Sequence, residues 1–262
     1  MLIVNTLKTL FLTLSTPLLI SLILVGSSYK ASSQEYFQQK VNYRIAVTLN
    51  DKLHELNAFE TIEYINNSPD TLRFLYFHLW PNGYLNNNTE LARQLLSLKG
   101  KARLFKDPEL KGYIDSLEFK VDDQSVHWNL LSNQSDICQI WLKKSLKPGD
   151  TIKIETPFHV KIPKGVTSRL GHIGESYQIS QWYPKPAVYD KSGWHQMSNQ
   201  DQGEFYSEFG SFDVSITLPA NYIVGATGNL QNKKEAEMLG MLAADTSWIS
   251  TLTSEKVDFP FL

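Results

Sequence analysis

The sequence contains little that would support thiol or nucleic-acid chemistry. Only one of the 262 residues is a cysteine, so Cys138 cannot form a disulfide within the chain. Cys138 alternates with Ile140 and Leu142, which predicts a buried core thiol. Basic residues number 25 and acidic residues 27, without the positive excess that nucleic-acid binding needs. We therefore expect no nucleic-acid partner.

Paired metal ligands are also lacking. The six histidines show no helical or hairpin spacing, and His54-Glu55 opens an H-E-x-x-H pattern whose fifth position is Ala58. G-x-S-x-G, P-loop and dinucleotide-binding glycine motifs are absent. The sequence therefore predicts no catalytic residue, metal site or cofactor in this chain.

Six acidic residues lie in or next to the aromatic stretch Tyr177–Val214. A pair of carboxylates could cleave a sugar, but the favoured explanation is that these are solvated loop acids, with Asp190 tying the turn at Ser192-Gly193. The acids concerned are Glu175, Asp190, Asp201, Glu204, Glu208 and Asp213.

The N-terminus carries the one long uncharged run. Lys8 is followed by an apolar segment to Tyr29 and then by small and polar residues, which is typical of an export signal over residues 1–33. An uncleaved anchor helix is the alternative, since the run is nearly long enough to span a bilayer. We expect a periplasmic or secreted protein that contacts a membrane only if the signal is uncleaved.

From Tyr36 onward hydrophobic residues recur at every second position, for example over Tyr43–Leu49 and Phe212–Leu218. This period predicts β-strands with one buried face, and Asn221–Thr227 is expected to pair with the second of these segments. The sequence thus predicts an all-β fold, a large antiparallel, sandwich-like domain over residues 34–230.

Two segments depart from this period. Asn88 or Thr89 can cap a short helix that ends at Gly100, with leucines along one side. Residues 231–262 have helical tendency and are expected to lead into another domain.

The stretch Tyr177–Val214 concentrates large aromatic residues, which indicates a site or an interface. Its segments SQWYPKPAVYDKSGWH and GEFYSEFGSFDVSITLPANYIVGATGNL resemble the end of the N-terminal β domain of aminopeptidase N-like zinc metallopeptidases, in a divergent bacterial branch. The earlier segment LYFHLWPNGYLNNNTELARQL resembles a strand and helix of the same domain.

The resemblance implies a saddle-shaped β domain that forms one wall of a peptide cleft. It implies that zinc and H-E-x-x-H belong to a catalytic domain beyond Leu262, so the chain alone is expected to be an inactive fragment. Ser180-Gln181 matches the family's Ser-Gln, which helps hold the substrate's N-terminal end. Tyr183 stands where the family has Glu or Gln, so Gln181 and Tyr183 are the implied substrate-binding residues.

A second interpretation remains open on the same residues. Trp182, Tyr183, Tyr189 and Trp194 could form an aromatic platform for a peptide or glycan in a non-enzymatic β-sandwich module. Under the first interpretation, Trp182, Tyr189 and Trp194 would instead contact the catalytic domain.

Overall fold

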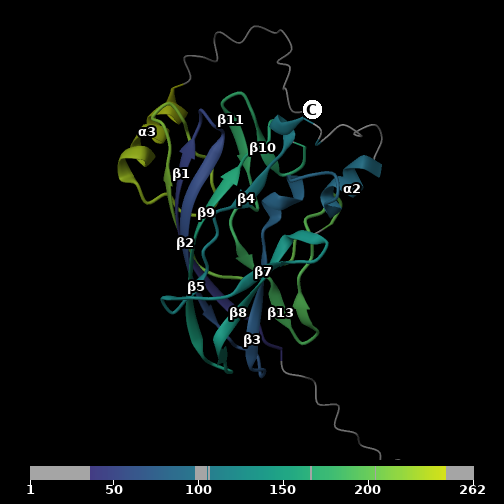
Figure 1. The fold of residues 1–262 in the computed structure, drawn as a ribbon. Helices are drawn as coiled ribbons and strands as arrows, with labels where there is room; N and C mark the ends of the chain where they lie inside the picture. Colours follow the sequence, from purple (N-terminus) through teal and green to yellow (C-terminus); the bar gives the residue numbers. More distant parts are fainter. Residues whose placement is uncertain (1–35, 98–104, 106, 166, 204, 246–262) are drawn as a thin grey trace, which may run out of the picture. The chain divides into compact units, whose positions relative to one another are not determined.

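The computed structural model describes residues 36–97, 105, 107–165, 167–203 and 205–245 (Figure 1). Two units divide the chain, one ending at Pro219 and the next beginning at Ala220. The expected signal segment, 1–33, lies outside the described residues.

The larger sheet of the first unit runs in the order β15-β1-β2-β9-β5-β6, with β4 also paired to β9. Its strands are β1 (Lys40–Asn50), β2 (Glu55–Ile65), β4 (Tyr113–Asp115), β5 (Lys120–Val121), β6 (Gln124–Ser125), β9 (Thr151–Lys161) and β15 (Phe212–Thr217). The period-two pattern places Val41, Tyr43, Ile45 and Val47 of β1 on its buried face. All pairings are antiparallel except that of β1 with β15, which is parallel.

A second sheet has the order β12-β3-β8-β7, all antiparallel. Its strands are β3 (Leu72–His78), β7 (Trp128–Leu131), β8 (Gln134–Leu146) and β12 (Lys185–Pro186). Two hairpins accompany the sheets, β10 (Leu170–Ile173) with β11 (Ser176–Ile179) and β13 (Val188–Asp190) with β14 (Gly193–His195).

The two sheets share one hydrophobic core, to which β1, β2, β3, β8 and β9 all contribute. Phe77 of β3 and Phe119, which precedes β5, meet in it with ring centroids 5.1 Å apart. Cys138 is fully buried there, and burial raises the pKa of its thiol, so the prediction of a core thiol is confirmed. The predicted all-β, sandwich-like fold is confirmed as well.

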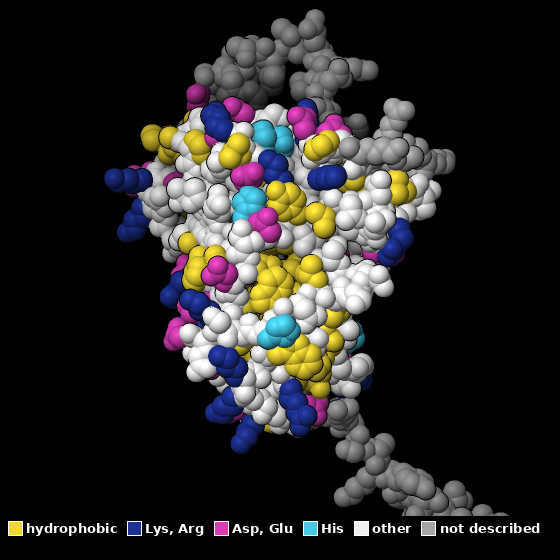
Figure 2. Space-filling view, in the orientation of Figure 1, with side chains coloured by type: hydrophobic (Ala, Val, Ile, Leu, Met, Phe, Trp, Pro, Cys, Tyr) yellow, Lys and Arg dark blue, Asp and Glu magenta, His cyan; other side chains and the backbone are white. Residues whose placement is uncertain are grey.

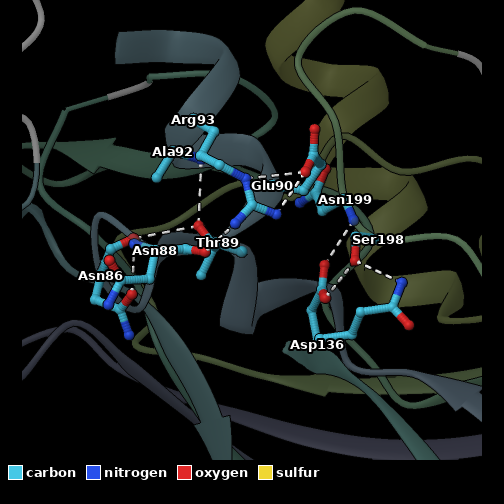
Figure 3. Close-up of polar contacts among 11 residues, drawn as sticks. Asn86, Asn88, Thr89, Glu90, Ala92, Arg93, Asp136, Ser198 and Asn199 are labelled. Atoms are coloured by element: carbon cyan, nitrogen blue, oxygen red, sulfur yellow. Dashed lines mark hydrogen bonds and ion pairs between the residues drawn. The ribbon is translucent and has the colours of Figure 1, made fainter. Parts of the chain in front are cut away.

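The helices are short. They are the 3-10 turns η1 (Trp80–Tyr84) and η2 (Pro108–Leu110), and the α-helices α2 (Glu90–Ser97) and, in the second unit, α3 (Lys233–Ala244). Thr89 caps α2, because its Oγ1 accepts a hydrogen bond from the Ala92 amide at 3.2 Å (Figure 3). The predicted end at Gly100 lies outside the described residues. Along the described segments, no helix is long and apolar enough to cross a membrane.

The expected strand at Asn221–Thr227 is wrong, since these residues form no strand. β15 pairs with β1 instead, and Phe212, Val214 and Ile216 sit in register with Tyr43, Ile45 and Val47. Their side chains therefore continue the core face of the sheet by one strand. They are nevertheless 40–50% exposed, so nothing described covers that extension.

Hydrophobic side chains also reach the outer face of the second sheet. Figure 2 shows them gathered in the region of β7, with Lys and Arg side chains toward the rim. Leu130 of β7 and Trp141 of β8 are each 43% exposed. The first unit thus exposes apolar side chains both on this face and on β15.

Candidate functional site

A buried lysine lies at the centre of the aromatic stretch. Lys185 of β12 is only 5% exposed, and its Nζ donates hydrogen bonds to Gln181 Oε1 at 2.8 Å and Ser207 Oγ at 2.7 Å. The same ammonium lies 4.0 Å from the centroid of the Trp80 ring, within cation–π range. Burial lowers the pKa of Lys185 to about 7.

Lys185 is paired in register with His78 of β3. The His78 ring stacks on Trp80 with centroids 4.4 Å apart. Burial, and then the neighbouring Lys185 cation, lower the pKa of His78 to about 3, so this imidazole is neutral. Within the described part of the chain, neither of its nitrogens has a hydrogen-bond partner.

A second cation approaches the same aromatic group. The Arg169 guanidinium carbon lies 4.5 Å from the Phe205 ring centroid, and Phe205 lies 4.3 Å from Trp80. Arg169 Nη1 is buried and bonds to no described residue. The site therefore contains two positive groups, and no ion pair to either is present among the described residues.

Gln181 joins this cluster through an unusual backbone. Its φ of 55° lies in the left-handed region, which is uncommon for a residue other than glycine. Its Oε1 accepts a hydrogen bond from Lys185, and its side chain as a whole is partly buried. Ser180 is turned away, because its hydroxyl donates to the Arg169 carbonyl at 2.7 Å.

Tyr183 packs on the adjacent strands β1 and β15 at the edge of the larger sheet. Its ring meets Tyr43 at 5.5 Å and Phe212 at 6.0 Å, both edge to face. Burial raises the pKa of Tyr183, and Glu60 raises it further. Glu60 is itself fully buried, and both its oxygens are without a partner among the described residues; burial raises its pKa well above the usual range.

The four residues of the possible platform form two separate pairs. Trp182 contacts Tyr183 and, at 5.9 Å, Phe158 of β9. Tyr189 and Trp194 lie 4.9 Å apart, and Trp194 packs on Tyr76 of β3 at 5.8 Å. All four are partly buried against the core, and no ring contact joins the two pairs in the described part of the chain.

The segment after Trp194 is held by a buried carboxylate. Asp136 of β8 accepts hydrogen bonds from Ser198 Oγ at 2.9 Å and from the Asn199 amide at 2.6 Å (Figure 3). Trp80 Nε1 donates to the Met197 carbonyl at 3.0 Å, which fixes the indole over Lys185. Asp136 therefore positions the segment that holds Trp80.

Of the remaining candidate acids, Glu204 lies outside the described residues, and Asp190 has a clear structural role. Asp190 accepts from the Ser192 amide at 2.7 Å and lies 2.8 Å from His195 Nε2, which confirms its predicted role in the turn. Among the described residues, no group of three or more His, Cys, Asp or Glu side chains could hold a metal ion. These residues therefore do not fit a zinc site.

The sequence pointed to Gln181 but not to the residues around it. Lys185 lies between Pro184 and Pro186 in an otherwise apolar run, and this was the available signal that its side chain would be buried. Trp80 and Arg169 lie 105 and 16 residues before Lys185 in the chain, so only the fold brings them to it.

A scan against family models finds none that matches, and a search of curated proteins finds no match. Among solved structures, the chain is similar to an M1 zinc metallopeptidase from Deinococcus radiodurans, with 12% identity, a TM-score of 0.39, and coverage of 76% of this chain and 36% of that one. It is also similar to native yeast LTA4 hydrolase, with 8% identity, a TM-score of 0.30, and coverage of 54% and 18%. A putative nutrient binding protein from Legionella pneumophila gives 13% identity, a TM-score of 0.28, and coverage of 50% and 41%.

The chain thus spans about a third of the length of the M1 zinc metallopeptidases among these structures. The sequence resemblance of the aromatic stretch is likewise to zinc metallopeptidases.

Proposed function

We propose that this chain is the N-terminal β domain of an exported, aminopeptidase-like zinc metallopeptidase, in which it forms one wall of the peptide cleft. The observation that carries the proposal is the segment from Ser180 to Trp194, whose sequence resembles that domain. The all-β fold and the packing of this segment against the core support it.

In this role the chain contributes binding surface and no chemistry. Gln181 and Tyr183 would border the cleft, and the catalytic domain would hold the zinc ion, since the described residues do not fit a metal. The chain alone is therefore proposed to be inactive. Trp182, Tyr189 and Trp194 are the aromatic residues proposed to contact the catalytic domain.

The test is an activity assay on the protein that includes this chain together with whatever its gene encodes after Leu262. We expect an H-E-x-x-H helix there, and release of N-terminal residues from peptides that stops with a chelator and returns with zinc. The 262-residue chain is the matched control and should release nothing. Chelator-sensitive turnover by that chain alone would contradict the proposal.

A further inference from the structure

We propose that the stacked pair of His54 and His172 is a pH-sensitive switch, which separates the β10–β11 hairpin from the turn between β1 and β2 when both imidazoles are protonated. The switch is a property of this chain by itself. Only its consequence for the peptide cleft rests on the proposed function, and that consequence is a regulation of the same site.

The two rings belong to different elements and lie face to face. His54 lies in the turn between β1 and β2, and His172 lies in β10. Their ring centroids are 3.6 Å apart, with an interplanar angle of 15°. Neutral imidazoles can stack in this way, whereas two imidazolium ions at this spacing repel each other.

Tyr177 joins the pair from β11. Its hydroxyl lies 2.7 Å from His54 Nδ1 and 3.4 Å from the Asp51 carbonyl, and its ring lies 5.8 Å from that of His54 and 5.7 Å from that of His172. His172 Nδ1 donates to the Gly174 carbonyl at 3.1 Å, within the hairpin. The turn therefore contacts the hairpin through the His54 ring and the Tyr177 hydroxyl.

The acids that face or adjoin the pair each have a cation beside them. The pairs are Asp51 with Lys52 at 3.6 Å, Glu55 with Lys161 at 3.3 Å and Glu109 with Lys164 at 2.6 Å. Burial, and then the neighbouring His172 and Lys161, lower the pKa of His54. The stacked form consequently binds fewer protons than the separated form, so it loses stability as the pH falls below the ordinary histidine pKa of about 6.5.

The hairpin is tied to the candidate site at both of its ends. Ser180 directly follows β11, and its amide and hydroxyl donate to the Arg169 carbonyl at 3.2 and 2.7 Å. Arg169 directly precedes β10 and lies over the Phe205 ring, and Gln181 follows Ser180. Movement of the hairpin would therefore displace Arg169 and Gln181. In the proposed enzyme, acid would loosen this border of the cleft.

The experiment measures amide hydrogen exchange of the 262-residue chain by mass spectrometry at pH 7.5 and pH 5.5, with the rates corrected for the intrinsic effect of pH. We expect exchange over residues 170–179 to rise about fivefold at pH 5.5, which is the factor that repulsion between like charges about 4 Å apart gives even in water. The paired strands β2 and β9 are the internal reference and should stay unchanged.

His54→Asn removes the titrating ring at a position with a φ of 53°, and asparagine is one of the residues that tolerate this left-handed backbone. Exchange over the hairpin should then be the same at both pH values. His127→Asn, at an exposed histidine, is the matched control and should keep the rise. Should His54→Asn fail to fold, His172→Phe keeps a stacking ring without a charge and should also make exchange independent of pH.

Three outcomes would overturn the inference: exchange in wild type that does not change with pH, a rise of equal size in β2 and β9, or a rise that persists in His54→Asn. The last would assign the effect to Lys185, whose pKa of about 7 lies in the same range. Activity of the longer protein on peptides decides the proposed function separately, so either can fail without the other.

Discussion

A lysine that is buried without a carboxylate beside it opposes folding whenever it is charged. Lys185 is stabilised by two neutral oxygens and an indole face, which offset part of the cost of desolvation and leave its pKa lowered to about 7. The site is therefore less stable than an apolar packing would be.

The lowered pKa of Lys185 determines whether the stability of the fold rises or falls with pH. The pKa of lysine is about 10.4 in the unfolded chain, so between about pH 7 and 10 the unfolded state binds more protons and stability rises with pH. The destabilisation, about 5 kcal/mol at most, is fully present below pH 7. We expect Lys185→Met to gain stability relative to wild type at pH 6 and to lose that advantage by pH 10.

Urea unfolding at pH 6, 8 and 10 measures this difference, with Lys191→Met as the control at an exposed lysine. A difference between Lys185→Met and wild type that does not change with pH would show that Lys185 titrates normally.

For single elements, the sequence predicted the features that depend on neighbouring residues, but it did not predict pairings between strands that are far apart in the chain. The alternation over Tyr43–Leu49 and the cap at Thr89 depend on neighbouring residues, and both are confirmed. The partner of β15 could not be predicted in this way, because a parallel partner need not be near in sequence. For the same reason, the sequence could not predict that Trp80 and Arg169 belong to the site.

Gly210 is the residue that lets β15 reach β1. A Cβ at this position would lie 1.5 Å from the Val41 carbonyl oxygen, so any side chain forces the backbones apart. We expect Gly210→Ala to lose the hydrogen bond from the Tyr43 amide to the Ser211 carbonyl and to destabilise the first unit by about 2–4 kcal/mol. Thermal or urea unfolding measures this.

Gly225→Ala is the matched control, because a Cβ there meets nothing within 4 Å. If both variants unfold like wild type, the close approach at Gly210 is not a feature of the protein in solution.

The uncovered core face of β15 predicts self-association. Phe212, Val214 and Ile216 expose a contiguous apolar strip, and such strips associate in water. We expect the chain to form dimers or larger species at micromolar concentrations, and Ile216→Lys to reduce them. Sedimentation velocity over a concentration series measures this.

Ser215→Lys adds the same charge to the opposite face of β15 and should leave association unchanged. Equal loss of association in both variants would point to net charge rather than to the apolar strip.

For the whole molecule, the sequence predicted the fold class but not the divided placement of its aromatic residues. The rings of Trp182 and Trp194 belong to one run of sequence, yet strand pairing sends one toward β9 and the other toward β3. The number of residues between the two tryptophans does not reveal which sheet each ring will contact, because strand β12 lies between them in the chain.

Export is a prediction that concerns the whole chain. The uncharged run after Lys8 predicts cleavage that leaves a mature N-terminus between Gly26 and Gln34. Intact-mass measurement of protein recovered outside the cytoplasm tests this, with protein from unfractionated cells as the reference. A mass that retains Met1 would favour the anchor helix instead.

The pairing of β1 with β15 also affects the order of events during synthesis. Tyr43 and its partner Phe212 are 169 residues apart, so the outer edge of β1 has no partner until nearly the entire first unit has been translated. At about 5–20 residues per second the delay is roughly 10–35 s. During that time an unpaired strand edge is open to any extended chain nearby, including the same strand of a second nascent copy. Translation speed and chaperone occupancy in that interval, rather than the stability of the finished protein, would then limit the yield of folded chains.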